Sequence, residues 1–367
     1  MQAAAELCTS RGIPVEATPF DLTYGELDLK VQVDAQAGAK PDVVLQGLNQ
    51  LIPLDSNDFV VDLTPLANGD ELVNDDTIPV LEAGRINGKQ LIVPWGISIP
   101  AVFVNTDIAA SAGVDLDSLV SWDAIEDASA AIAESADNVY GIAFPLQEGW
   151  VPLQYLLTAG TELIDGDNAP VFNDDAGDLA IEHINRLYSS GGAFPGDESA
   201  SREAFASGEV GLFIASSSFI QQFADTSFEW TTVPFPPVEE GGDVVTGAGG
   251  AGLAIFADPD RQAAAWEVVK CALDAEILAT YAVETIGYLP VRSDIESSLE
   301  PGLLDSAPYA APWSQFGLAG PWLNFPGDDG PRALARFNEA WVEATQQSSN
   351  PTAVMDAAAA EIAGLLP

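Results

Sequence analysis

Apolar positions along this chain follow two patterns, short continuous runs and longer amphipathic stretches. The runs are rich in Val, Ile, Leu and Phe and end at glycine, proline or polar residues, which is typical of strands buried on both faces. They predict strands at residues 42–45, 91–94, 101–104, 141–144, 210–214, 230–233 and 252–256. A further strand-like run occupies residues 13–19.

Amphipathic stretches separate these runs and predict helices, because their apolar residues recur three and four positions apart. Ser121 before acidic residues is a typical helix start, and Gly38 before Pro41 is a typical stop. The predicted helices cover 1–8, 24–37, 106–112, 121–135, 175–189, 199–206, 217–224, 260–272, 275–285 and 333–366, the last interrupted at Asn350–Pro351. This alternation predicts an α/β fold with mainly parallel sheets flanked by helices.

Two segments depart from the regular alternation. The chain opens on a helix followed by the run at 13–19, so we expect it to begin inside an α/β unit whose first strand is missing. Residues 301–331 are rich in Pro, Gly and Trp with little periodicity, and we expect them to line or border a site.

The length of 367 residues exceeds what one hydrophobic core usually organises and favours two lobes. An apolar fraction of 47% and a mean hydropathy of +0.14 indicate a globular chain. The sequence contains no uninterrupted apolar run of about 18 residues, the length that would predict a membrane span.

The charge is strongly negative, with 56 acidic and 12 basic residues and a formal net charge of −44. Nucleic acid is excluded as an expected partner, because phosphate backbones are bound by clusters of Lys and Arg and here these residues are scattered. Such a surface is suited to a saline or extracellular setting, where salt screens self-repulsion.

Cysteine and histidine are too scarce for most metal or redox chemistry. Cys8 and Cys271 are the only cysteines and leave one disulfide possible. His183, the only histidine, lies in a helix-like pattern and is expected to be a surface or boundary side chain. We therefore expect no metal site, no cofactor and no His-based catalytic centre.

Several motifs, taken in their order and spacing, resemble a known family over nearly the whole chain. These are Tyr24 with Gly38 and residues 41–44, then 94–100 with 104–105, 205–210, 249–255, 265–270 and 287–292. They resemble the extracellular solute-binding proteins of ABC importers, in the branch of the maltose- and glycerol-3-phosphate-binding proteins.

The resemblance implies a two-lobed periplasmic-binding-protein fold, in which hinge-linked lobes close on a ligand held in a cleft. Residues 1–101 with 256–300 would form the N-terminal lobe. Residues 106–251 with 301–367 would form the C-terminal lobe. The crossings would fall near 102–105 and 252–255.

The resemblance also implies ligand contacts at positions matching motif residues, namely Tyr24, Ser98, Ser216 or Ser217, Gly249 or Gly250, and Tyr288. Hydroxyls, main-chain N–H groups exposed at glycines, and aromatic faces suit polyol and phosphate ligands. Ser216 and Ser217 lie at a strand-to-helix junction, where they could bind an anion or cap the next helix.

Two departures bear on whether the ligand carries phosphate. An acidic residue used by the glycerol-3-phosphate group is replaced in the stretch 45–49, where Gln46 or Asn49 could bond hydroxyls. The arginine that holds phosphate in that group would fall near Leu334, whereas this chain has Arg332 and Arg336. Arg332 could reach the cleft, or both could be surface charges.

Loop tryptophans favour a neutral sugar instead, since indole rings form stacking platforms for sugars. The tryptophans in predicted loops or strand ends are Trp95, Trp150, Trp313 and Trp322. Packing in the core is the alternative for each of them.

The sequence thus predicts the substrate-binding component of an ABC transporter, which captures a sugar, polyol or glycerophosphodiester and delivers it to a membrane permease. We expect a monomer in the periplasm or outside the cell, with any membrane anchor in a leader outside this chain. The alternative is a secreted glycoside-processing enzyme with paired carboxylates such as Glu148 and Asp167. Acidic residues are abundant enough for such spacings to arise by chance, so we expect no enzymatic activity.

Overall fold

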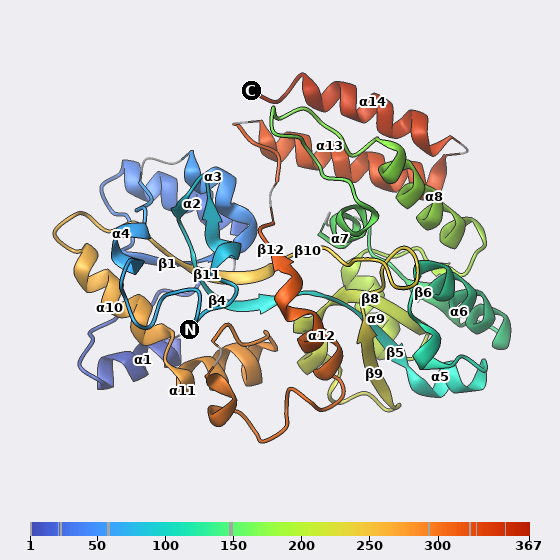
Figure 1. The fold of residues 1–367 in the computed structure, drawn as a ribbon, viewed down its shortest axis with the longest axis horizontal. Coiled ribbons are helices and arrows are strands. Elements are labelled where there is room, and N and C mark those ends of the chain that lie inside the picture. Colours follow the sequence, from blue (N-terminus) through green and yellow to red (C-terminus); the bar gives the residue numbers. More distant parts are fainter. Residues whose placement is uncertain are drawn as a thin grey trace. The chain divides into compact units, whose positions relative to one another are not determined.

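The computed structural model describes residues 2–20, 22, 24–56, 59–146, 150–292, 294–322, 324–327, 329–348 and 350–367. The chain forms two compact units, each assembled from separate stretches of sequence (Figure 1). Unit 1 comprises Met1–Ser98, Ala248–Leu303 and Ala319–Leu323. Unit 2 comprises Ile99–Gly247, Leu304–Leu318 and Asn324–Pro367.

Unit 1 is built around a three-stranded sheet in the order β1-β11-β4. These strands are β1 (Val43–Gly47), β11 (Gly249–Ile255) and β4 (Val93–Ser98). Both pairs are antiparallel, with Leu45 opposite Leu253 and Gly250 opposite Ile97. A small antiparallel ribbon joins β2 (Arg85–Ile86) to β3 (Lys89–Gln90).

Helices and turns pack around this sheet. The helices are α1 (Gln2–Ser10), α2 (Tyr24–Gln36), α3 (Leu51–Asp55), α4 (Thr64–Ala67), α10 (Gln262–Ala272) and α11 (Ala275–Ile277), followed by the π-helical η5 (Leu278–Ile286). Short 3-10 turns occur at η1 (Leu48–Gln50), η2 (Leu81–Gly84) and η6 (Ile295–Ser298). A disulfide between Cys8 and Cys271 joins α1 to α10 across 263 residues of sequence.

Unit 2 contains a mixed five-stranded sheet in the order β7-β6-β8-β5-β9. Its strands are β5 (Pro100–Asn105), β6 (Tyr140–Ala143), β7 (Ala193–Phe194), β8 (Val210–Ser216) and β9 (Trp230–Pro234). β6 pairs in parallel with β7 and β8, whereas β5 pairs antiparallel with β8 and β9. Phe103, Phe205 and Phe223 pack edge to face beside this sheet, with ring centroids 4.9–6.2 Å apart.

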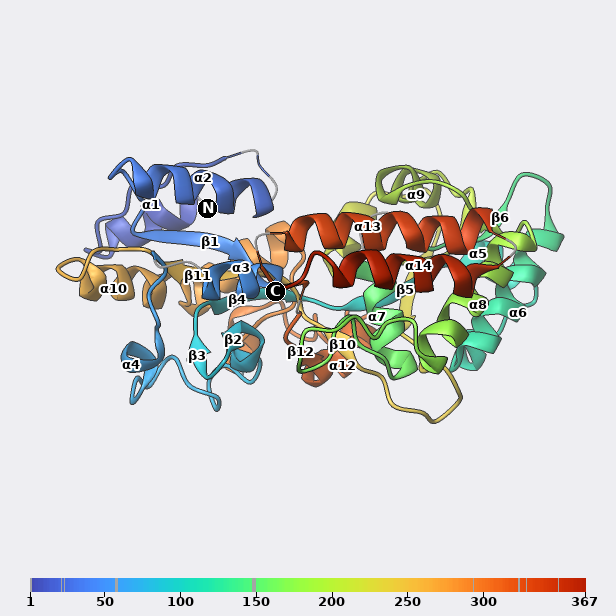
Figure 2. The same ribbon diagram turned by 90° about the horizontal axis from the view of Figure 1, so that it is seen from above.

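The helices of unit 2 include an adjacent group near the carboxyl terminus, where α13 packs against α14 and α14 against α8 (Figure 2). The helices are α5 (Thr106–Ser111), α6 (Trp122–Ser135), α7 (Trp150–Ala159), α8 (Asp175–Ser189), α9 (Glu198–Ala206), α12 (Ala310–Gln315), α13 (Gly330–Val342) and α14 (Pro351–Ala363). The remaining elements are η3 (Leu116–Ser118), η4 (Ser217–Phe223), η7 (Phe316–Leu318), η8 (Glu343–Gln347) and the two-residue strands β10 (Thr246–Gly247) and β12 (Ala319–Gly320). None of the described helices has the length and apolar character needed to cross a bilayer.

The α/β class is confirmed, but the prediction of mainly parallel sheets is wrong. Unit 1 has only antiparallel pairs among its described strands. β11 enters the sheet after the long excursion through unit 2, so its direction is not set by a crossover helix from β1. β5 follows β4 almost directly, and it likewise runs antiparallel to its neighbours.

Three local predictions also differ from the structure. Residues 13–19 belong to no helix and join no described sheet. The helix predicted at 217–224 is the 3-10 element η4 (Ser217–Phe223), and most of the helix predicted at 275–285 is the π-helical η5.

The units differ in detail from the predicted lobes. Residues 102–105 lie inside β5 of unit 2, and 252–255 lie inside β11 of unit 1. The chain leaves unit 1 after Ser98 and re-enters it at Ala248. Residues 301–303 and 319–323 belong to unit 1 and not, as predicted, to the lobe of the carboxyl-terminal residues.

Candidate functional site

Two tyrosines meet beside the sheet of unit 1. Tyr24 is the first residue of α2, and Tyr288 follows Gly287, which ends η5 in the left-handed conformation with φ 91°. Their hydroxyl oxygens are 3.3 Å apart. Burial raises the pKa of both Tyr24 and Tyr288, so both phenols stay protonated at neutral pH and can donate and accept hydrogen bonds.

Glycines in the neighbouring strands make room for these rings. A Cβ at Gly47 of β1 would lie 2.6 Å from Cδ2 of Tyr24, and a Cβ at Gly96 of β4 would lie 2.4 Å from Cδ2 of Tyr288. Leu289 then exchanges main-chain hydrogen bonds of 2.7 and 3.2 Å with Ile97. The tyrosine pair is therefore fixed by the sheet.

Gly250 allows the middle strand to approach β4 closely. Its φ is +103°, and a Cβ there would lie 2.2 Å from the carbonyl oxygen of Gly96. The register shifts between Ala251 and Gly252. Gly249 lies opposite Ser98, which is buried. These predicted residues thus come together in unit 1 with Tyr24 and Tyr288.

Gln46 of β1 is fully buried opposite Gly252. Neither its amide nitrogen nor its amide oxygen has a hydrogen-bond partner among the described residues. A buried amide without partners is costly, and it can be satisfied by hydroxyl groups of a ligand or by water. Asn49 lies close by, because its Oδ1 would be 2.4 Å from a Cβ at Gly47.

Trp95 belongs to the core of unit 1. It is fully buried, and its indole N–H donates to the carbonyl oxygen of Ala272 at 2.8 Å. A ring packed on all sides offers no stacking platform, so we do not carry Trp95 into the proposed site. Trp322, also in unit 1, is half-buried.

The two serines of unit 2 are engaged in local hydrogen bonds. Ser216 Oγ accepts from Ser218 N at 3.2 Å and pairs with Ser218 Oγ at 2.7 Å. Ser217 is fully buried, and its Oγ accepts from Ile99 N at 3.2 Å. The structure therefore shows the capping role that the sequence left open for Ser216.

The other aromatic candidates of unit 2 lie on helices. Trp150 begins α7 and is buried, and Trp313 of α12 packs on Phe316 with ring centroids 4.8 Å apart. α7 was not predicted. Residues 151–156 are all buried, so the helix lacks the amphipathic period on which a sequence reading depends.

The arginines considered for phosphate are engaged in ion pairs. Arg332 is 69% exposed and lies 2.6 Å from Asp329, and Arg336 lies 2.5 Å from Glu361. Among the residues that the structure describes, 11 of the 12 basic side chains form such pairs with acidic partners. Arg202 lies over the ring of Phe219, 5.3 Å from its centroid.

His183 is buried, so the prediction of a surface or boundary side chain is wrong. Its Nδ1 shares a hydrogen bond with the hydroxyl of Tyr155, and burial lowers the pKa of the imidazole, with Arg186 adding to the effect. Asp123, Glu126 and His183 offer ligand atoms within 4.8 Å of one another. Arg186 already holds Glu126 through bonds of 3.0 and 3.1 Å, so this group is a satisfied structural network.

The carboxylate pair considered for catalysis gains no support from the geometry. Glu148 lies outside the described residues. Asp167 is exposed in a turn, where its N–H donates to Asp165.

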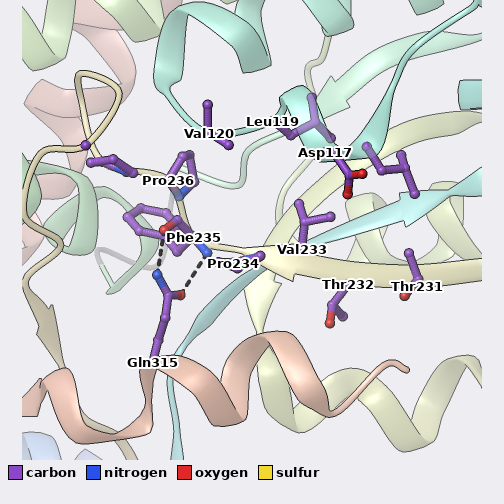
Figure 3. A pocket seen from close by; sticks show the side chains of 13 residues that line it. Asp117, Leu119, Val120, Thr231, Thr232, Val233, Pro234, Phe235, Pro236 and Gln315 are labelled. Carbon is purple, nitrogen blue, oxygen red and sulfur yellow. Dashed lines mark hydrogen bonds between the residues drawn. The ribbon is translucent and has the colours of Figure 1, made fainter. Parts of the chain in front are cut away.

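A pocket of about 580 Å³ in unit 2 was not anticipated from the sequence (Figure 3). It lies along the edge strand β9 and the following prolines, opposite Leu119 and Val120. The Gln315 side chain closes one wall by bonding both main-chain groups of Phe235, at 2.8 and 2.9 Å. None of the predicted ligand-binding residues lines it.

Comparison with known families matches residues 2–311 to the bacterial extracellular solute-binding proteins. The chain belongs to this family. The predicted family is therefore confirmed, and the family consists of binding proteins and not of enzymes. The catalytic alternative is set aside on that ground.

Individual relatives are distant in sequence and close in fold. The arabinooligosaccharide-binding protein of Halalkalibacterium halodurans is 21% identical over 305 residues, which are 76% of this chain and 64% of that protein. The sugar-binding protein MalE of Xanthomonas citri is 20% identical with a TM-score of 0.84, covering 99% of this chain and 94% of that one. UgpB of Mycobacterium tuberculosis, solved with glycerophosphocholine, is 16% identical with a TM-score of 0.83 and the same coverage. This solute-binding-protein fold is as predicted.

Proposed function

We propose that this protein is the substrate-binding component of an ABC importer and that it captures an uncharged sugar or polyol outside the cytoplasm. The ligand selects one conformation of the protein, which a membrane permease then recognises. Membership in the extracellular solute-binding family supports the general role. Relatives of similar fold bind both sugars and a glycerophosphodiester, so the ligand class must be argued from this chain.

The tyrosine pair of unit 1 carries the proposal. Tyr24 and Tyr288 present two neutral hydroxyls held side by side, and Gln46 adds an amide with no partner among the described residues. Hydroxyl and amide groups that both donate and accept match the hydroxyl groups of a sugar. Ser98, Asn49, Gly249 and Gly250 of the same unit stay in the proposed site with them, and Trp322 stays as an aromatic contact. Trp150 of unit 2 stays a prediction from the sequence.

The basic residues argue against a phosphate group as the main determinant. Arg332 is exposed and paired with Asp329. A phosphate is normally held by an arginine free to form bidentate bonds, and freeing Arg332 would leave Asp329 without its partner. We therefore propose a neutral ligand and no binding role for Arg332.

Calorimetry and thermal shift test the function directly. The panel is maltose, ribitol, an arabinooligosaccharide, glycerophosphocholine and glycerol 3-phosphate, because a ligand that binds the native state raises its melting temperature. We expect at least one neutral member to bind. Heat and a thermal shift from the phosphate-bearing compounds alone, abolished by Arg332→Ala, would show that the neutral assignment is wrong.

Removing one hydroxyl tests the tyrosine pair. Tyr24→Phe and Tyr288→Phe keep the rings, and each should weaken sugar binding about three- to tenfold, which corresponds to the loss of about 0.5–1.5 kcal/mol for one hydrogen bond. Tyr281→Phe in η5 is the matched control and should leave the dissociation constant unchanged. If Tyr24→Phe and Tyr288→Phe bind the sugar as tightly as the unsubstituted protein and Tyr281→Phe do, the tyrosine pair does not contact the ligand.

A further inference from the structure

The pocket of about 580 Å³ in unit 2 has the size and the walls of a small-ligand site (Figure 3). Ligand pockets of proteins measure about 300–1,000 Å³ and are lined mainly by apolar side chains. One wall is formed by residues 231–237, which are β9 and the residues after it, and the other by the segment 116–120 before α6. Eight of the 13 lining residues are Leu, Val, Pro or Phe.

The wall formed by β9 is held in place by the protein itself. Three of its residues are prolines, whose φ is fixed at about −65°. Gln315, which is 9% exposed, donates to the carbonyl oxygen of Phe235 at 2.8 Å and accepts from its N–H at 2.9 Å. The main-chain N–H of Trp122 is shared between the carbonyl oxygens of Pro237 and Val238, at 3.2 and 3.3 Å. A preformed wall lets a ligand bind without the cost of ordering the protein first.

Asp117 is the one charged residue among the described residues that line the pocket. Its side chain is exposed and is directed toward β9 (Figure 3). Its main-chain N–H donates to Asp115 at 3.1 Å, but within the described part of the chain its carboxylate forms no hydrogen bond or ion pair. The hydroxyl of Thr231 on the other wall has no hydrogen-bond partner there either. The pocket thus offers a negative charge and a hydroxyl beside apolar walls.

The charge of the protein decides the sign of a ligand for this pocket. A net charge of −44 attracts cations and repels anions. The basic side chains of the chain do not neutralise Asp117, because 11 of the 12 are paired with other carboxylates and Arg202 lies over Phe219. A divalent metal ion is a poor match, since it requires several oxygen ligands and the pocket supplies one carboxylate. The apolar walls favour an organic cation.

We propose that this pocket binds a small organic cation, a primary alkylammonium compound, at a site separate from the proposed sugar site. The ammonium group would donate to the Asp117 carboxylate and to the Thr231 hydroxyl, since it carries three donors on one compact charge. The apolar body would lie between Val120 and Val233 and cover Val120, which is 41% exposed. No residue of the proposed sugar site lines this pocket, so either proposal can fail while the other holds.

Three pentyl compounds that differ in charge test the proposal, namely pentylammonium, pentan-1-ol and pentanoate. Each is titrated into the protein labelled with nitrogen-15 at about 0.15 M salt, and NMR follows the amide signals. Pentylammonium should bind in the millimolar range, as its small size implies, and should shift the amide signals of Val120, Val233 and Gly241. Pentan-1-ol lacks the charge and should bind about two- to fivefold more weakly. Pentanoate should cause no shifts at these residues.

Two substitutions test the contacts. Asp117→Asn keeps the shape of the side chain and should remove the preference for pentylammonium over pentan-1-ol. The matched control is Asp127→Asn on α6, which removes one negative charge from an exposed position outside the pocket and should leave that preference unchanged. Val120→Lys places a cation at the pocket and should abolish pentylammonium binding, while sugar binding and the melting temperature stay the same because Val120 is exposed.

Three results would overturn the proposal. The first is equal binding of pentylammonium and pentan-1-ol. The second is an equal loss of preference in Asp117→Asn and Asp127→Asn, which would reduce the effect to general attraction by the acidic surface. The third is a set of shifted signals spread over both units and not concentrated at the pocket.

Discussion

At the scale of single residues, the geometry of unit 1 depends on positions where no side chain fits. Gly47 and Gly96 leave space for tyrosine rings, but those rings could shift by small rotations. Gly250 is different, because the atom that a side chain would strike is the main-chain oxygen of Gly96 and the backbone is in the left-handed region. The central strand therefore cannot accept another residue there without moving away from β4.

Gly250→Ala should destabilise the protein by about 2–4 kcal/mol, because it combines backbone strain with a collision inside a sheet. Urea unfolding measures the loss. Gly302→Ala is the control, since Gly302 has φ +78° with open space around it and should cost only about 1 kcal/mol. If both substitutions lower the free energy of unfolding by a similar amount, the collision with β4 adds nothing to the cost of Gly250→Ala.

His183 makes stability depend on pH in a predictable direction. Its pKa in the folded state lies below the ordinary 6.5, so below pH 6.5 the unfolded chain binds a proton that the folded chain does not. The contribution is complete above pH 6.5 and is lost as the pH falls through the folded pKa. NMR titration of the one histidine should give a midpoint below 6.5, and His183→Gln should flatten stability between pH 6.5 and the onset of carboxylate titration. A midpoint at or above 6.5 contradicts this reading.

At the scale of elements, the sequence predicts whether most segments form a helix or a strand, but it does not predict whether neighbouring strands run parallel or antiparallel. α6 begins at the predicted cap, where Ser121 Oγ accepts from Ala124 N. The runs at 101–104 and 210–214 fall within β5 and β8, but they pair antiparallel, because hydrophobic periodicity does not encode strand direction. The run at 13–19 shows the alternating exposure that is typical of a strand, but it pairs with no described strand. Pairing also requires a neighbouring strand, which the run itself does not encode.

The candidate site was anticipated in part for similar reasons. Tyr24 and Tyr288 come from motifs, and the structure brings them together across 264 residues of sequence. The sequence could not distinguish a core role for Trp95 from a role in stacking against a sugar. The partner of its indole N–H is a main-chain carbonyl on α10, and main-chain partners leave no mark in the sequence.

The helix α1 depends on its covalent link more than on its packing. It buries only Ala4, Ala5 and Cys8, and Arg11 just beyond it forms surface ion pairs with Asp274 and Glu276. Small buried side chains contribute little hydrophobic free energy, and exposed ion pairs contribute about 0–1 kcal/mol. The Cys8–Cys271 disulfide is therefore the main attachment.

Breaking this disulfide should lower the free energy of unfolding by about 2–4 kcal/mol. Urea unfolding with and without a reductant measures the change, and circular dichroism reports whether helix is lost first. The double variant Cys8→Ala with Cys271→Ala should have the same free energy of unfolding as the reduced protein, and adding the reductant should not change it. If reduction leaves unfolding unchanged, the packing of α1 is stronger than its small buried residues indicate.

At the scale of the whole molecule, acidic residues exceed basic ones by 44, and 11 of the 12 basic side chains are already used in pairs. The remaining carboxylates have no internal cations to neutralise them. Folding brings these charges closer together than they are in the unfolded chain, so electrostatic repulsion opposes the compact state. The repulsion must then be screened by ions in solution.

The melting temperature at pH 7 should therefore rise steadily with sodium chloride, as the Debye length falls from about 30 Å at 0.01 M to about 3 Å at 1 M. Surface ion pairs also weaken over this range, but each contributes only about 0–1 kcal/mol. The pairs of like charges that repel one another are far more numerous, so the net effect of salt is stabilising. The control is the same salt series near pH 4.1, the isoelectric point, where the net charge vanishes and the slope should be much smaller. An equal slope at both pH values would show that salt acts on apolar surface and not on the acidic charge.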